Sequence, residues 1–86
     1  MTDTIIMYAT AWCPDCRRAK RYLDDHGIAY QVVDIDRDPE GRAFVEQVNH
    51  GNRSVPTILF PDGSFLVEPR NSALAEKLSI ALETKS

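Results

Sequence analysis

The sequence predicts an α/β domain in which one mixed four-stranded sheet carries helices on both faces. Three observations predict this fold class. Short apolar runs rich in Val and Ile, typical of strands, alternate with segments that begin and end on helix signals. A Pro-Asp-Gly-Ser turn separates the last two apolar runs. The order is strand-helix-strand, helix, strand-strand, helix, and a chain of 86 residues has room for one such domain over residues 1–86.

The first third of the chain predicts a strand-helix-strand unit. The apolar run at residues 5–8 indicates a buried strand. A helix is expected over residues 14–26, because Pro14 suits the first helical position and Gly27 suits a left-handed stop. Residues 30–35 are rich in Val and Ile and predict a second strand. Since crossover connections are right-handed, these two strands should run parallel.

A second helix and a hairpin are predicted in the middle of the chain. Asp38 can cap a helix that begins at Pro39, and Gly51 can close it. The strands expected at residues 57–60 and 65–67 flank the short turn, so they should pair antiparallel.

The last predicted helix begins at Asn71 or Ser72. Its leucines recur at a spacing of four, which indicates a face turned to the core: Leu74, Leu78 and Leu82. Because an uncovered hairpin would expose its apolar side, the economical arrangement is one sheet with helices on both faces.

Charge and hydropathy limit which classes of partner and which cellular compartment we expect. A net charge of −3 argues against a general nucleic-acid binder, whose affinity would come from a surplus of Lys and Arg. Residues 1–8 lack the basic start and apolar run of a secretory signal, and no later segment approaches a membrane span. We therefore expect a cytoplasmic protein, where closely spaced cysteines are more often catalytic or metal-binding than structural.

Both cysteines lie at the start of the first predicted helix, in the stretch TAWCPDC. Positions 13 and 16 share a helix face, so their sulfurs can form a disulfide that opens and closes. The stripe of Cys16, Ala19 and Leu23 turns Cys16 to the core and leaves Cys13 at the exposed N-terminus. There, unpaired N–H groups and the helix dipole favour the thiolate, which predicts Cys13 as nucleophile and Cys16 as resolving cysteine.

Charged neighbours should tune that thiolate. The carboxylate of Asp15 opposes it, whereas Arg17 and Arg18 favour it if they reach the sulfur. The run RRAKR has two further readings, attraction of acidic partners or a solvated helix face.

A zinc site is the main alternative for a Cys-x-x-Cys pair. Structural zinc takes four ligands, and here the only nitrogen candidates are His26 and His50, both expected at helix ends. A strand that ends at Cys-x-x-Cys on a helix N-terminus favours a redox centre, so no metal site is predicted.

The stretches TAWCPDC and RSVPTILF, with this element order, resemble the glutaredoxin branch of the thioredoxin fold across nearly the whole chain. Within that branch, YATAWCPDC and VNHGNRSVPTILFPDGS are most similar to the mycoredoxins, whose partner thiol is mycothiol instead of glutathione. The resemblance implies the strand order 2-1-3-4 with the third strand antiparallel. It also implies a cis bond between Val55 and Pro56, beside Cys13, and a backbone at Val55 that pairs with the peptide-like part of the substrate.

Departures from the glutathione-dependent pattern support the mycothiol interpretation. Those enzymes usually have Lys where this chain has Thr10, and Tyr where it has Asp15. They also have a Gly-Gly turn that binds a carboxylate before the last helix, where this chain has Glu68 and Pro69.

Two more residues are candidates for substrate binding. The ring of Trp12 either contacts the substrate or covers the edge of the core with its N–H in water. Arg53 either reaches the polar end of the thiol ligand or only adds surface solubility.

The predicted activity is thiol–disulfide exchange without a tightly bound cofactor. Mycothiol or another low-molecular-weight thiol is the expected co-substrate, and the Cys13–Cys16 pair is the redox-active disulfide. Expected partners are S-thiolated or disulfide-containing proteins and an NADPH-dependent disulfide reductase, and a monomer is expected. Either Cys13 alone passes through a mixed disulfide with the small thiol, or Cys16 resolves a mixed disulfide with a protein.

Three alternatives stay open at this point. One is a hydrogen donor of ribonucleotide reductase that depends on thioredoxin reductase, although the Trp-Ser-Gly-Phe segment common in those proteins is absent. The others are a metal or iron–sulfur carrier and a non-catalytic adaptor.

Overall fold

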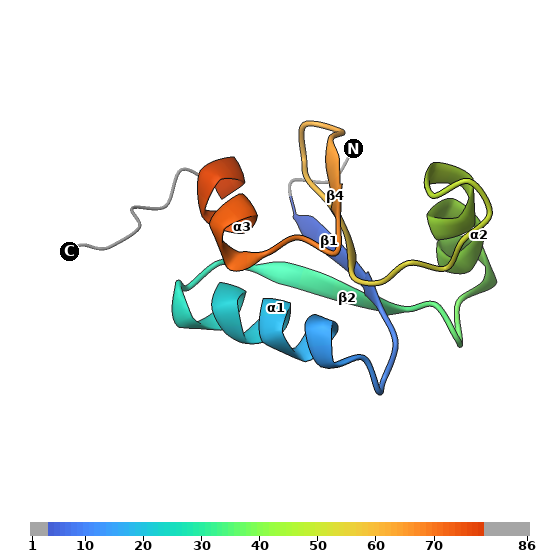
Figure 1. The fold of residues 1–86 in the computed structure, drawn as a ribbon, viewed down its shortest axis with the longest axis horizontal. Coiled ribbons are helices and arrows are strands. Elements are labelled where there is room, and N and C mark those ends of the chain that lie inside the picture. The colour runs from blue at the N-terminus through green and yellow to red at the C-terminus, as the bar shows by residue number, and fades with distance from the viewer. Residues whose placement is uncertain (1–3, 79–86) are drawn as a thin grey trace.

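The computed structural model describes residues 4–78, and this part of the chain forms a single sheet with three helices (Figure 1). The elements are β1 (Ile5–Ala9), α1 (Pro14–Asp25), β2 (Tyr30–Asp34), α2 (Pro39–Val48), β3 (Thr57–Leu59), β4 (Phe65–Val67) and α3 (Asn71–Leu78). The predicted order is confirmed, and the bounds differ by a residue or so. Leu82 lies outside the described residues. Within residues 4–78, no helix has the length and apolar character needed to cross a membrane.

The four strands form one mixed sheet in the order β2-β1-β3-β4. β1 runs parallel to β2, with Met7 opposite Val32, and antiparallel to β3, with Met7 opposite Ile58. β4 pairs antiparallel with β3. The implied strand order and the reversed third strand are therefore confirmed.

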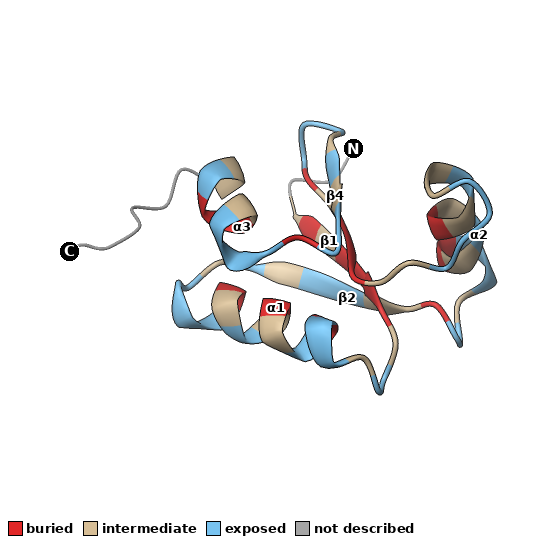
Figure 2. Cartoon of the chain, in the orientation of Figure 1, coloured by how far each residue is buried: buried red, intermediate tan, exposed pale blue. Residues whose placement is uncertain are grey.

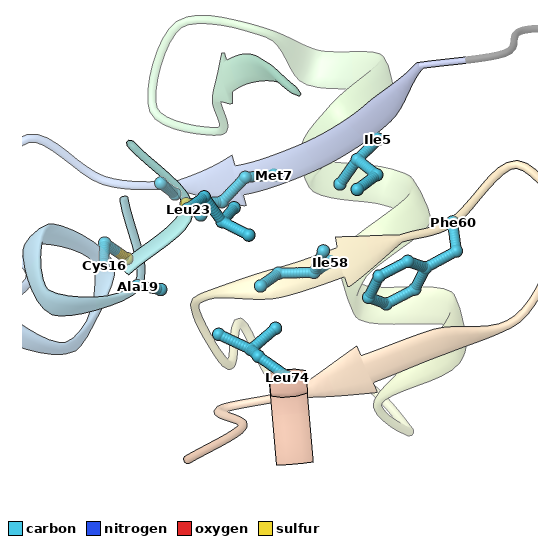
Figure 3. Close-up of a cluster of buried hydrophobic side chains, with 9 residues drawn as sticks. Ile5, Met7, Cys16, Ala19, Leu23, Ile58, Phe60 and Leu74 are labelled. Carbon is cyan, nitrogen blue, oxygen red and sulfur yellow. The ribbon is translucent and has the colours of Figure 1, made fainter. Parts of the chain in front are cut away.

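Helices cover both faces of the sheet, α1 and α3 on one side and α2 on the other (Figure 1). Figure 2 shows the buried residues concentrated on β1 and on the helix faces that turn toward the sheet. The main cluster lies between the sheet, α1 and α3 (Figure 3), and its fully buried members are Met7, Cys16, Ala19, Leu23, Ile58 and Leu74. The predicted stripe on α1 and the core position of Leu74 are thus confirmed.

The hydrophobic cluster on the opposite face of the sheet is smaller, and a glycine lets α2 approach the sheet there. Tyr8 packs its ring against Phe44, with ring centroids 4.9 Å apart. A Cβ at Gly41 would lie 2.7 Å from Cγ1 of Val33 and 3.4 Å from the Tyr8 ring. Because real Cβ atoms do not approach other heavy atoms so closely, the absence of a side chain at Gly41 sets the distance between α2 and the sheet.

Local signals explain where α2 begins and ends. Asp38 is its N-cap, and the carboxylate accepts hydrogen bonds from the N–H groups of Glu40 and Gly41 at 3.1 and 3.2 Å. The helix ends before the predicted stop at Gly51, because Asn49 is the C-cap and His50 already has a left-handed φ of 56°. Gly51 follows with φ 93° and completes the turn.

Substitution of Gly41 by Ala should destabilise the fold. Alanine normally stabilises a helix by about 1 kcal/mol relative to glycine, but the new methyl group would collide with the stiff side chain of Val33. We expect Gly41→Ala to lower the free energy of unfolding by about 1–3 kcal/mol, as overpacking does elsewhere, measured by urea denaturation.

The double variant supplies the control. In the Val33→Ala background the colliding atom is absent, so the same change should cost much less or stabilise the protein. An equal cost in both backgrounds would show that contact with Val33 is not the cause.

Candidate active site

Cys13 lies at the N-terminus of α1 and caps the helix with its sulfur. Its backbone is extended (φ −89°, ψ 113°), and its Sγ accepts a hydrogen bond from the N–H of Cys16 at 3.1 Å. Pro14 takes the first helical position, as predicted, where a missing N–H costs nothing. The half-buried sulfur therefore sits against the positive end of the helix, where negative charge on it is stabilised.

The segment before β3 reaches the same point from the other side. The peptide bond between Val55 and Pro56 is cis, and the Cys13 thiol donates to the carbonyl oxygen of Val55 at 3.7 Å. The implied cis bond and its place beside Cys13 are thus confirmed. Among residues 4–78, the N–H of Val55 has no hydrogen-bond acceptor. A half-buried backbone N–H beside the Cys13 sulfur is a donor that a bound peptide can use.

Cys16 lies behind Cys13 in the main core, beside Ala19 and Leu23 (Figure 3). Its side chain is fully buried, and the pKa of its thiol is raised to about 12. Burial is the main cause and a hydrogen bond with the Cys13 side chain adds to it, whereas the backbone of Thr10 and the charge of Lys20 act in the opposite direction.

An open cavity of about 330 Å³ lies between the first turns of α1 and the segment that leads into α3, lined by Asp15, Arg18, Glu68, Arg70 and Asn71. Arg18 ties its two walls together: its guanidinium donates to Oδ1 of Asn71 at 2.6 Å and to the carbonyl of Pro69 at 2.7 Å. The same guanidinium lies 3.8 Å from the carboxylate of Asp15. Arg18 thus links α1 to the segment before α3, and its hydrogen bonds lead away from Cys13.

The backbone of this second segment is anchored to the cis-proline. The N–H of Glu68 donates to the carbonyl of Pro56 at 2.8 Å, and Glu68 has a left-handed φ of 48°. Since Pro69 has no N–H, this turn does not present the consecutive N–H groups that bind an anion. The interpretation of Glu68 and Pro69 made from sequence agrees with this geometry.

The remaining predicted site residues fall in different places. The side chain of Trp12 is 70% exposed, so its alternative reading as a cover for the core edge is wrong, and substrate contact stays a prediction. The Nε of Arg53 donates to Glu46 at 2.8 Å, which directs this end of the side chain to α2. Within residues 4–78, no three His, Cys, Asp or Glu side chains are placed to hold a metal ion.

Sequence reasoning missed the cavity and the role of Arg18 in linking its two walls. The run RRAKR indicated one charged helix face, and nothing local separates Arg18 from its neighbours. Its partners lie 51 and 53 positions further along the chain. Only the docking of the segment before α3 beside α1 distinguishes it.

Comparison with known proteins agrees with this geometry. The family model described as Glutaredoxin matches residues 5–66. "Putative glutaredoxin Rv3198A" of Mycobacterium tuberculosis is 42% identical over 78 residues, covering 91% of this chain and 93% of that protein. Mycoredoxin 1 of Corynebacterium glutamicum is 39% identical over 76 residues, covering 88% and 94%. Glutaredoxin-like protein NrdH of Lactococcus lactis is 36% identical over 62 residues, covering 71% and 82%.

Solved structures show the same fold. The glutaredoxin from Methanosarcina mazei superimposes with a TM-score of 0.72 at 30% identity, covering 87% of this chain and 77% of that one. The glutaredoxin from Archaeoglobus fulgidus gives 0.71 at 26% identity, covering 90% and 87%. The predicted thioredoxin fold is confirmed. With its helix-capping Cys13, its cis Val55–Pro56 bond and these relatives, the chain belongs to the glutaredoxin family.

Proposed function

We propose that this protein is a cytoplasmic thiol–disulfide oxidoreductase that uses mycothiol to reduce mixed disulfides between this thiol and proteins. One observation carries the proposal: the sulfur of Cys13 is held by an N–H at the start of α1 and lies 3.7 Å from the Val55 carbonyl. A nucleophile and a backbone that can hold its substrate are therefore adjacent. Mycoredoxin 1, the relative at 39% identity, supports mycothiol as the thiol.

The one-cysteine route needs only Cys13. Its thiolate attacks the mycothiol sulfur of a mixed disulfide, the protein thiolate leaves, and Cys13 becomes bonded to mycothiol. The thiolate of a second mycothiol attacks that bond, which releases mycothiol disulfide and restores the Cys13 thiolate. An NADPH-dependent reductase then supplies the electrons that return the disulfide to two thiols. The N–H of Cys16 favours Cys13 as leaving group in the second step, because it stabilises negative charge on that sulfur.

The two-cysteine route adds an attack by Cys16 on the sulfur of Cys13. This step forms the Cys13–Cys16 disulfide, releases the reduced target thiolate and requires the Cys16 proton to leave first. Burial opposes that loss by raising the pKa of Cys16 to about 12, while Thr10 and Lys20 act in the opposite direction. The high pKa supports the one-cysteine route as the faster one for small thiols.

The cavity between α1 and the segment before α3, which includes Asp15 of the Cys-x-x-Cys motif, suits a polar thiol that carries no carboxylate. Its walls carry two cations, Arg18 and Arg70, and two carboxylates, Asp15 and Glu68, together with the amide of Asn71. Such a mixed set can hydrogen-bond a ligand rich in hydroxyl groups. The N–H of Glu68 is already bonded to Pro56, so the turn has little to offer a free carboxylate such as that of glutathione.

A second candidate is a hydrogen donor for ribonucleotide reductase that receives electrons directly from thioredoxin reductase. The Lactococcus lactis relative NrdH supports it, as does the presence of a resolving cysteine at position 16. This function would use both cysteines in every turnover.

Cys16→Ser protein should form and release an adduct with mycothiol in preference to glutathione. We expect mycothiol disulfide to add one mycothiol to Cys13, and free mycothiol to remove it, at least tenfold faster than the glutathione pair does. Rapid mixing followed by intact mass spectrometry measures both steps. Slow or absent turnover with both thiols would overturn the small-thiol function, and reduction of the wild type by thioredoxin reductase would then support the second candidate.

Alkylation should distinguish the two thiols. At about pH 7.5 a thiol of pKa about 12 is ionised in on the order of one molecule in 10⁴ or fewer, so iodoacetamide should label Cys13 and leave Cys16 unmodified. Burial raises this pKa by favouring the neutral form, so unfolding in urea at the same pH should restore labelling of Cys16. Equal labelling of Cys16 in native and unfolded Cys13→Ser protein would contradict the assigned environment.

Arg70→Ala should weaken recognition of mycothiol. Loss of a cation from the cavity wall removes a hydrogen-bond donor to the ligand, so we expect KM for mycothiol disulfide to rise several-fold with little change in kcat. Arg21→Ala is the matched control, since Arg21 is an exposed cation of α1 outside the cavity. Equal effects of the two substitutions would assign the change to overall charge instead of the cavity.

A further inference from the structure

The end of α2 is connected by hydrogen bonds to the segment that carries Val55. The side-chain amide of Asn49 donates to the carbonyl of Val45 at 2.9 Å and to Oγ1 of Thr57 at 3.2 Å. The Thr57 hydroxyl in turn donates to the carbonyl of Ser54 at 2.8 Å. We call this chain of contacts, from Asn49 through Thr57 to Ser54, the Asn49–Thr57 brace.

Thr57 is the central residue of the brace, and its burial makes the hydrogen bonds costly to lose. Its side chain is 0% exposed, and among residues 4–78 it is the buried polar residue of the core. A buried hydroxyl without partners costs free energy, whereas here one donor and one acceptor satisfy it. The geometry of the brace is therefore well determined.

The brace closes around the two residues of the cis peptide. Ser54 precedes Val55, and Thr57 follows Pro56, so the bond from the Thr57 hydroxyl to Ser54 spans that pair. The other fixed point of the segment is the carbonyl of Pro56, which accepts from Glu68 at 2.8 Å. Between these points the carbonyl of Val55 faces Cys13, and its N–H is left for a ligand.

A second connection between α2 and this segment is weaker. Arg53 pairs with Glu46 at 2.8 Å, but the two side chains are 61% and 35% exposed. Exposed ion pairs contribute little and are screened by salt. The buried brace is thus the connection that fixes the Val55 backbone.

We propose that Asn49 and Thr57 are positioning residues that hold the Val55 backbone where it can pair with the peptide-like part of a disulfide substrate. The proposal rests on the proposed function, since it takes Val55 as the residue that binds substrate. The hydrogen bonds of the two side chains go to Val45, Ser54 and each other, and not to a sulfur. They act only through the position of Val55.

Two disulfide substrates separate positioning from chemistry. One is a peptide with a single mycothiolated cysteine, which offers a backbone to Val55. The other is 2-hydroxyethyl disulfide, which has no peptide group and is mixed with pre-reduced protein in the absence of mycothiol, because free mycothiol would convert it to a mixed disulfide that carries an amide. We expect Thr57→Val and Asn49→Ala to lower kcat/KM for the peptide about tenfold, mainly through KM, because hydrogen bonds to a displaced backbone weaken. The rate with 2-hydroxyethyl disulfide should change less than about twofold.

Matched variants guard against a general loss of structure. Thr57→Ser keeps the hydroxyl and should retain the activity with the peptide. Thr57→Val keeps the shape of the side chain but lacks the hydroxyl, so its activity with the peptide should fall. Gln47→Ala changes an exposed residue of α2 outside the brace and should leave both activities unchanged. If Thr57→Val does not fold, Asn49→Ala and Thr57→Ser carry the comparison, with circular dichroism confirming the fold of each.

Different results would overturn the brace proposal and the proposed function. Equal losses for both substrates in the folded variants, or a lowered Tm with unchanged KM for the peptide, would show a purely structural role and overturn the brace proposal alone. Wild-type protein that does not reduce the mycothiolated peptide in the presence of mycothiol would overturn the proposed function, and this inference with it.

Discussion

The hydrogen bond from the N–H of Cys16 to the sulfur of Cys13 is the interaction on which the arrangement of the site depends. It begins α1, because an N-cap side chain satisfies one of the unpaired N–H groups of the first turn. It also holds the Cys13 sulfur where the helix favours negative charge. Folding and reactivity thus use the same contact, and a cysteine performs the capping that Ser, Thr, Asp or Asn performs in most helices.

The inequality of the two thiols follows from the direction of that helix. The same turn that exposes Cys13 places Cys16 in the core beside Ala19 and Leu23, where burial raises the pKa of its thiol to about 12. The raised pKa of Cys16 thus comes from its place in the core and not from the kind of side chain. The packing of α1 against the sheet, not the identity of the residues, assigns their roles.

The substrate side of the site is assembled from segments that are distant in sequence. Cys13 follows β1, and its sulfur contacts Val55. The end of α2 is hydrogen-bonded to Thr57, two residues after Val55. The segment before α3 is hydrogen-bonded to Pro56 and to Arg18. Each connection uses a backbone carbonyl or a side-chain amide as acceptor or donor. Because hydrogen bonds require defined geometry, these connections hold Cys13, the Val55 backbone and the cavity in one fixed relation.

Sequence alone determined the features whose causes lie within a few residues. The caps at Asp38 and Gly27, the hairpin turn, and the inward stripe of α1 depend on local backbone preferences and on helical periodicity, so element order and the asymmetry of the cysteines were predictable. The cis bond at Pro56 was predicted only through family resemblance, since the local sequence does not specify it.

Tertiary structure decided the contacts between positions far apart in the chain. The Val55 carbonyl meets a sulfur 42 positions away, and Arg18 finds Asn71 across 53 positions. Such pairs depend on strand register and on how each helix docks on the sheet, which no short window of sequence contains. For that reason the mixed-charge cavity, the brace behind Val55 and the raised pKa of Cys16 emerged only once the elements were packed together.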